Sequence, residues 1–213
     1  MSRAGQAFLL DCLTREIDYV PLDDTLELLV LDTRKPRKLV SSAFNQRVEE
    51  CRAAYAVLHR RDPDLPCLAR AGRAAVDAAR ADMGETVWRR ARHIVDESER
   101  MRQARAALAA RDHAALGRLV REAHGSCREF FEVSCDELDF LVEGVCAIPG
   151  VHGARLTGAG FGGCVVALGE RGAVGEAEAA ALLGAYRARF GWDAALLRLD
   201  LGGALAEVPV GEA

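Results

Sequence analysis

Residues 156–164 read Leu-Thr-Gly-Ala-Gly-Phe-Gly-Gly-Cys, and four of the nine are glycines. Apolar residues alternate through the preceding segment, 151–156, and an apolar run, 165–168, follows the loop. These patterns predict two strands joined by a glycine-rich loop. Glycine reaches positive φ and lets other atoms approach the backbone closely. The spacing alone is equally consistent with a tight β-hairpin turn and with a loop that faces a phosphate.

The glycines at 158, 160 and 163 also match the pattern GxGxxG. In a dinucleotide-binding domain a helix starts directly after these glycines, because its N-terminus binds the pyrophosphate. Here the sequence Cys-Val-Val-Ala-Leu-Gly follows, which is typical of a buried strand. The loop also lacks the Gly-Lys-Ser/Thr sequence of a Walker phosphate-binding loop. Both of these nucleotide-binding motifs are therefore excluded.

The order of residues in the loop is more informative than the glycine spacing. It closely resembles the third conserved motif of the GHMP small-molecule kinases, in its galactokinase form. Other parts of the chain resemble galactokinases as well, namely 5–22, 32–33, 50–51, 131–139, 142–143, 148–151 and 153–155. The resemblance runs from about residue 5 to about residue 168, so it covers most of the chain.

Three other galactokinase motifs do not occur in the sequence. They are a sugar-binding segment of the form RVNLIGEH, a Gly/Ser-rich ATP loop, and a GxMDQ segment whose aspartate is the proposed catalytic base. In the family all three precede the segments found here. The resemblance thus implies that residues 1–213 form a single domain corresponding to the C-terminal half of a galactokinase. We expect the N-terminal half that binds ATP and sugar to be absent, and a separate chain carrying it is one implied partner.

Composition indicates an ordinary globular protein, with 50% hydrophobic and 28% charged residues among 213. The net charge of −4 gives no indication of nucleic acid or an anionic membrane as a partner. No segment approaches the roughly 20 apolar residues of a membrane span. Seven cysteines without a CxxC pair predict free thiols in a reducing cytoplasm. The five histidines show no zinc-ligand spacing, so no metal site is expected.

The apolar periodicity predicts two groups of strands separated by helices. We expect strands at 7–13, 17–22 and 26–32, helices at 43–60, 67–82, 85–110, 113–131 and 135–147, strands at 152–157 and 164–168, a helix at 174–189 and a strand at 194–201. This order indicates an α+β fold with an antiparallel or mixed sheet packed with helices. A C-terminal domain of this kind is also what the GHMP kinase resemblance implies.

The resemblance implies ATP-dependent phosphorylation of galactose at its anomeric hydroxyl. Such a transfer depends mainly on positioning and on charge stabilisation. In the family, the N-terminal half supplies the base, and the glycine motif supports the shape of the ATP loop. The active-site residues of this chain would therefore be Thr157, Gly158, Gly160, Gly162 and Gly163, none of them catalytic. ATP and Mg²⁺ are the cofactors of the complete enzyme, and we expect this chain alone to bind neither strongly and to be inactive.

One family sugar contact maps onto this chain. In an S-x-Y-x-x-R segment the tyrosine hydroxyl reaches galactose, and here residues 42–47 read Ser-Ala-Phe-Asn-Gln-Arg. Phe44 takes the place of the tyrosine, so a hydrogen bond worth roughly 0.5–1.5 kcal/mol is absent. Phe44 is also expected to be the first core residue of the helix stripe Phe44, Val48, Cys51, Tyr55 and Leu58.

Three further expectations concern an alternative function, self-association and a group of acidic residues. Because of Phe44 and the missing base, the alternative is a non-catalytic galactokinase-like sugar sensor or interaction module. A half-enzyme exposes the surface that packs on its other half, which favours self-association. The acids Glu132, Asp136, Glu137 and Asp139 suggest a catalytic or metal cluster, but we prefer a capping box for Ser134 and Glu137.

Overall fold

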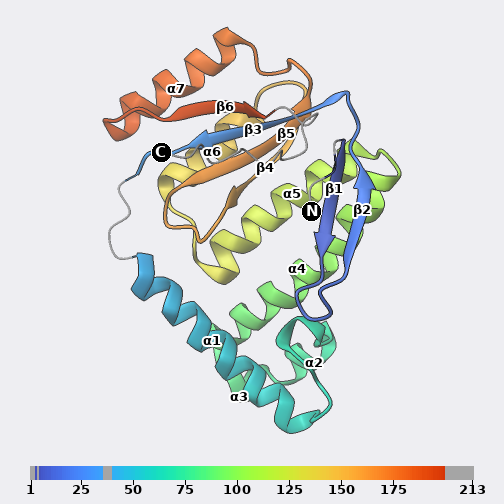
Figure 1. Cartoon of the computed structure of the whole chain (residues 1–213). Coiled ribbons are helices and arrows are strands. Elements are labelled where there is room, and N and C mark those ends of the chain that lie inside the picture. Colours follow the sequence, from blue (N-terminus) through green and yellow to red (C-terminus); the bar gives the residue numbers. More distant parts are fainter. Residues whose placement is uncertain (1–2, 4, 36–39, 200–213) are drawn as a thin grey trace, which may run out of the picture.

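The computed structural model describes residues 3, 5–35 and 40–199. It has an α+β fold with two antiparallel sheets (Figure 1). The larger sheet has the strand order β4-β5-β3-β6, and the smaller one is the hairpin β1-β2. The strands are β1 (Gln6–Leu10), β2 (Ile17–Pro21), β3 (Leu26–Asp32), β4 (Val151–Thr157), β5 (Cys164–Glu170) and β6 (Ala195–Leu199). The predicted α+β class is confirmed, in its antiparallel form.

Helices separate the two groups of strands, as the sequence predicts. They are α1 (Val40–Arg61), the 3-10 turn η1 (Leu68–Arg70), α2 (Arg73–Ala78), α3 (Arg80–Met83), α4 (Glu85–Ala109), α5 (His113–Ser126), the π-helical turn η2 (Cys127–Phe131), α6 (Asp136–Cys146) and α7 (Glu176–Phe190). None of the described helices is both long and apolar enough to cross a membrane. None of the seven cysteines forms a disulfide bond in the structure.

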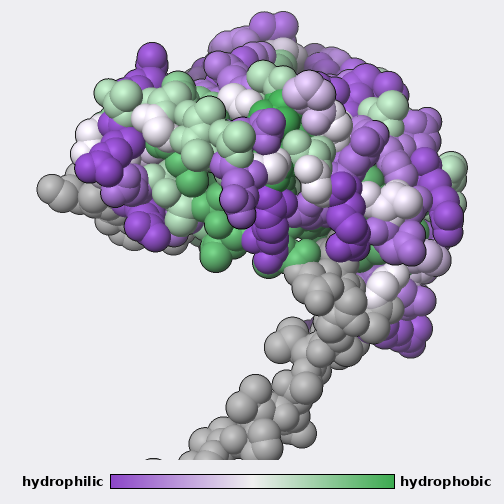
Figure 2. Space-filling view, turned by 90° about the horizontal axis from the view of Figure 1, so that it is seen from above, coloured by the Kyte–Doolittle hydropathy of each residue, from purple (hydrophilic) through white to green (hydrophobic). Residues whose placement is uncertain are grey.

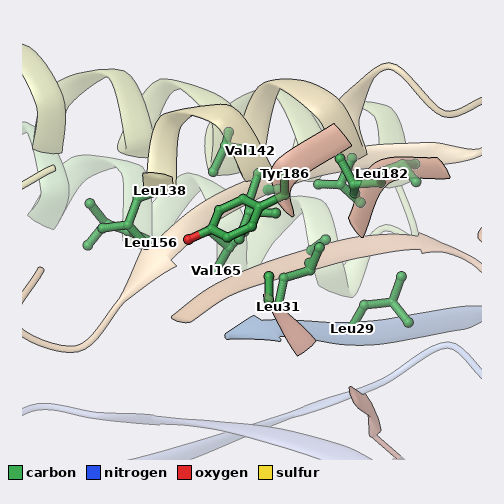
Figure 3. Close-up of a cluster of buried hydrophobic side chains, with 14 of the residues drawn as sticks. Leu29, Leu31, Leu138, Val142, Leu156, Val165, Leu182 and Tyr186 are labelled. Atoms are coloured by element: carbon green, nitrogen blue, oxygen red, sulfur yellow. The ribbon is translucent and has the colours of Figure 1, made fainter. Parts of the chain in front are cut away.

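One face of the larger sheet carries the main hydrophobic core. Alternate residues of β3, Leu29 and Leu31, point to this face and are buried. Figure 3 shows Tyr186 of α7 among the apolar side chains of α6 and the sheet. Tyr186 is fully buried, and its hydroxyl donates to the Thr33 carbonyl oxygen at 2.8 Å. Burial raises the pKa of Tyr186 to about 12, so the hydroxyl stays protonated and available as a donor.

The opposite face of the sheet is also apolar. In the strand register, Val30 lies opposite Val166 and Leu197, and Leu28 lies opposite Leu168 and Leu199. Directly opposed residues share a face, so these six side chains form one surface, which we call the open sheet face. Leu197 and Leu199 are 55% and 45% exposed there. Seen from above, hydrophobic residues gather toward one side of the molecule, among hydrophilic ones (Figure 2).

A second hydrophobic core lies among the helices that are distant from the larger sheet (Figure 1). The buried residues Ala54 and Leu58 of α1 pack there with Val76 of α2 and with Ala91 and Val95 of α4. The β1-β2 hairpin lies against α4, where Asp18 pairs with Arg105. The described part of the chain therefore has two hydrophobic clusters, and the long helix α4 contributes to the second one only.

Two of the predicted helices differ from those observed. The helix predicted at 67–82 is wrong, because this segment forms η1, α2 and α3 in succession. Gly72 precedes α2 in an extended conformation, and Ala79 leaves the helical region between α2 and α3. The helix predicted at 113–131 ends as α5 at Ser126 and continues as the π-helical turn η2. Of the strand predicted at 194–201, residues 200 and 201 lie outside the described residues.

Candidate functional site

The glycine-rich loop joins β4 to β5, with Thr157 paired opposite Cys164. Its six residues, 158–163, connect two antiparallel neighbours, so the two predicted strands form a hairpin with a loop longer than a tight turn. Positive φ occurs at five of the six, Gly158, Gly160, Phe161, Gly162 and Gly163. Residues 157–159 are exposed, whereas the glycines at 160, 162 and 163 are buried. The exposed half is therefore the part available to another molecule, and the buried half anchors it.

Gly160 lies directly against the segment that follows η2. A Cβ atom at Gly160 would be 2.1 Å from the Val133 carbonyl oxygen. The next residue, Phe161, donates its backbone N–H to that same oxygen at 2.7 Å. Phe161 has φ of 60°, a conformation that costs a residue with a side chain about 1–2 kcal/mol. The contact with Val133 and the packing of the ring on the core hold it there.

The far end of the loop is tied to β3 and α7 through Thr33, which is fully buried. The Gly163 carbonyl oxygen accepts from the Thr33 N–H at 2.9 Å and from its hydroxyl at 2.8 Å. The Thr33 carbonyl oxygen accepts in turn from Tyr186 and, at 3.1 Å, from Trp192. Sequence reasoning did not select Thr33 as an anchor. The sequence carried two signals for it, a polar residue directly after an apolar strand and the resemblance of residues 32–33 to galactokinases.

An ion pair lies beside Gly162. A Cβ atom at Gly162 would be 3.3 Å from the Lys35 Cβ, and Lys35 Nζ lies 2.7 Å from Glu137 Oε2. Burial raises the pKa of the Glu137 carboxyl, but the hydrogen bond from Lys35 and the other local donors outweigh it and lower the pKa. Glu137 is therefore held as a carboxylate. The capping box predicted for Ser134 and Glu137 is wrong, because Ser134 donates to Asp139 at 2.5 Å instead.

The acids of the 132–139 segment do not converge on one point. Glu132 pairs with arginines, Glu137 with Lys35, and Asp139 with His124 at 3.0 Å. Within residues 3, 5–35 and 40–199, no group of three or more His, Cys, Asp or Glu residues is placed to hold a metal ion. These carboxylates thus stabilise local structure, each through its own partner.

Phe44 lies apart from the glycine loop, on the first turns of α1. It is 46% exposed, so the expectation that it begins the core is wrong. The buried apolar contacts of α1 begin later, at Ala54, because only the later turns reach the second core. Phe44 instead lines an apolar groove of about 390 Å³ with residues such as Val48, Tyr55 and Phe131.

The exposed end of the loop opens onto a different cavity. Thr157 and Gly158 line a space of about 420 Å³ together with Leu28, Val166 and Leu168 of the open sheet face. The remaining wall comes from α4, α5, the end of β4, the start of β3 and Leu22 before it. The structure thus brings the glycine-motif residues together and places their exposed end beside an apolar surface. Phe44 does not belong to this cavity.

Known proteins share both the sequence and the fold. Residues 104–188 match the family model for the GHMP kinases C terminal. The chain is 42% identical over 174 residues to the galactokinase of Roseiflexus sp. (strain RS-1), which covers 81% of this chain and 44% of the relative. It is 41% identical over 178 residues to the galactokinase of Homo sapiens, covering 83% and 44%. The chain spans about half the length of the curated relatives it matches.

A solved structure agrees with these matches over nearly the whole chain. The galactokinase of Lactococcus lactis, complexed with galactose, superimposes with a TM-score of 0.88 at 33% sequence identity. The alignment covers 96% of this chain and 53% of that one. The family model, the relatives and the fold agree: residues 104–188 match the GHMP kinase C-terminal family, and the chain is similar to the C-terminal portions of galactokinases.

Proposed function

We propose that this chain contributes the C-terminal wall of a galactokinase active site, for phosphoryl transfer from ATP to the anomeric hydroxyl of galactose. The observation that carries the proposal is the construction of the glycine loop. Its buried half is fixed by Val133, Thr33 and Lys35, whereas residues 157–159 are exposed. A loop held in this way presents Thr157 and Gly158 in a fixed position beside the ATP phosphates, as the family resemblance implies.

The chain's own residues position the reactants and do not carry the proton transfer. Phosphoryl transfer needs mainly alignment and charge stabilisation, and the glycines allow close approach of another backbone. The described residues offer no set of three ligands for Mg²⁺. Binding of ATP and Mg²⁺, and the catalytic base, are therefore assigned to the half of the enzyme that this chain does not span. The chain alone is inactive in this account.

That other half is proposed to pack on the open sheet face. The cavity beside Thr157 and Gly158 shares part of its wall with this face, so a partner on the face lies beside the site as well. The relatives are about twice as long as the matched region, which leaves a half of similar size to fill this role. Without it, the exposed Leu197 and Leu199 favour self-association of the chain.

Phe44 is proposed to stand at the sugar-contacting position of the family. Its ring lines an apolar groove, and it offers no hydroxyl to a sugar. The lost hydrogen bond weakens binding of galactose roughly two- to tenfold. Seven cysteines without a disulfide bond fit a reducing compartment, so we place the protein in the cytoplasm. The similarity to galactokinases does not favour the alternative of a non-catalytic sensor.

The proposal is tested by assaying galactose 1-phosphate formation with the purified 213-residue chain, alone and mixed with the unmatched N-terminal segment of the Roseiflexus galactokinase. We expect no product from the chain alone, and galactose-dependent ATP consumption when the two are combined. Product formed by the chain alone would refute the assignment of the base to the other half. The same mixture, made with the Gly160→Ala variant of the chain, shows whether the activity depends on the glycine loop.

A further inference from the structure

Four consecutive carbonyl groups at the end of η2 are bound by arginine side chains. A helix end leaves its last carbonyls without backbone partners. Here they accept from Arg89, Arg90 and Arg47, which come from α4 and α1. The contacts are Arg89 Nη1 to Glu129 O at 3.1 Å, Arg90 Nη1 to Phe130 O at 2.5 Å, Arg47 Nε to Phe131 O at 2.6 Å and Arg47 Nη2 to Glu132 O at 3.1 Å.

The three arginines are matched by two carboxylates, and two of the three are buried. Arg90 is 1% exposed and Arg47 is 8% exposed. Glu50 Oε2 accepts from both, at 2.7 Å and 3.0 Å, and the Glu132 carboxylate accepts from Arg90 and Arg89 at 2.5 Å. Burial raises the pKa of Glu50, but the two arginines outweigh it and lower the pKa, so Glu50 stays ionised. Every charge in this group therefore has a partner.

A buried ionic group of this kind is not explained by its contribution to stability alone. Apolar side chains of similar volume often stabilise a fold as well or better. Guanidinium groups, however, present several donors in a fixed planar arrangement. Here those donors bind backbone oxygens from Glu129 to Glu132, and so they fix the path of the chain as it leaves η2.

The chain path at this point determines the position of the glycine loop. Glu132 has φ of 55°, and this left-handed residue turns the chain into Val133. The Val133 N–H donates to Cys127 O at 3.0 Å, and its carbonyl oxygen accepts from Phe161 and touches Gly160. Val133 directly follows Glu132, the last residue with an arginine-bound carbonyl, and itself contacts the loop. One residue therefore links the arginines to the loop.

We propose that Arg47, Arg89 and Arg90 are positioning residues for the glycine loop. They hold the carbonyls of η2, which places the Val133 oxygen, and that oxygen fixes Phe161 and Gly160. The value of this arrangement for catalysis rests on the proposed function. The mechanical coupling does not, because it depends only on contacts within the chain.

The test is amide hydrogen exchange of the 213-residue chain, resolved by NMR. Arg90→Lys keeps the charge but cannot make the three separate contacts of the guanidinium. We expect exchange at the Phe161 amide to rise about tenfold, with amides of β3 changed less than twofold. Arg102→Lys is the matched control, because this arginine lies on the same helix and its side chain is 74% exposed. The control should leave Phe161 unchanged.

Equal changes at Phe161 and in β3, or no change at Phe161, would overturn the proposal. If Arg90→Lys does not fold, Arg89→Lys replaces it, because that side chain is 31% exposed and less critical to the core. A rise of about threefold at Phe161 alone is then expected. Unchanged exchange in this variant counts against the proposal too. Neither result depends on galactokinase activity, so a failure here is distinct from a failure of the proposed function.

Discussion

Replacing Gly160 with alanine should destabilise the chain far more than replacing Gly158. Both glycines have φ of 80°, so an alanine is strained to the same extent at either position. Their surroundings differ. A Cβ atom at Gly158 meets nothing within 4 Å, whereas one at Gly160 would lie 2.1 Å from the Val133 oxygen and 2.8 Å from the Val133 Cβ. The pair of variants therefore separates backbone strain from close approach.

The magnitudes follow from these contacts. The left-handed conformation costs an alanine about 1–2 kcal/mol, which is the whole effect expected for Gly158→Ala. At Gly160 the loop must move away from Val133, and overpacking of this kind costs about 1–3 kcal/mol. The movement also breaks the hydrogen bond from Phe161 to Val133, and a buried polar group left unpaired costs about 1–3 kcal/mol more. Gly160→Ala should thus cost about 3 kcal/mol or more in total.

The measurement is the free energy of unfolding of both variants by urea, followed by far-ultraviolet circular dichroism at pH 7. A difference of at least about 2 kcal/mol between the variants is expected, with Gly160→Ala the less stable. Small domains have about 5–15 kcal/mol in all, so this difference is easily resolved. Equal losses at the two positions would show that the contact with Val133 does not hold the loop, and the account of the site would be wrong.

Three further predictions concern the anchor, the pH dependence and the open face. Thr33→Val removes the hydroxyl bond to the Gly163 oxygen and should cost about 1–2 kcal/mol in urea unfolding, since the Thr33 N–H still binds that oxygen. Burial lowers the pKa of His93 to about 4 in the folded chain, whereas in the unfolded chain the His93 pKa is near 6.5. As the pH falls, the unfolded chain therefore takes up a proton at His93 before the folded chain does. The unfolding free energy should therefore drop by up to about 3 kcal/mol between pH 6.5 and 4, and His93→Gln should reduce this slope in urea titrations at several pH values. Leu197→Asp should shift light scattering at high protein concentration toward the monomer mass, and a wild-type chain that is already monomeric would contradict the self-association.

Local patterns predicted the strands and most helices well. Alternation and apolar runs identify β3, β4 and β5 because strand side chains point to opposite faces, and both faces of this sheet are apolar. The segment 67–82 differs from its prediction because its alanines and arginines favour a single helix, whereas the chain breaks at Gly72 and Ala79. Gly72 was the one visible sign of a break.

Contacts between distant residues decided what the sequence could not predict. Glu137 has the spacing of a capping box, but its partner is Lys35, 102 positions away in the chain. The π-helical turn depends on arginines of α1 and α4, and no local pattern near η2 indicates them. Phe44 fits a helical stripe, yet it is exposed because the early turns of α1 pack on nothing in the second core.

The central claim is that these 213 residues complete a galactokinase active site with their glycine loop. The most direct test is a chimaera in which this chain replaces the matched region of the Roseiflexus galactokinase. Purified chimaera is assayed for galactose 1-phosphate formation, with Gly160→Ala and Phe44→Tyr as companion variants. We predict activity, its loss in Gly160→Ala, and tighter galactose binding in Phe44→Tyr. A folded chimaera that binds ATP but forms no galactose 1-phosphate would contradict the claim.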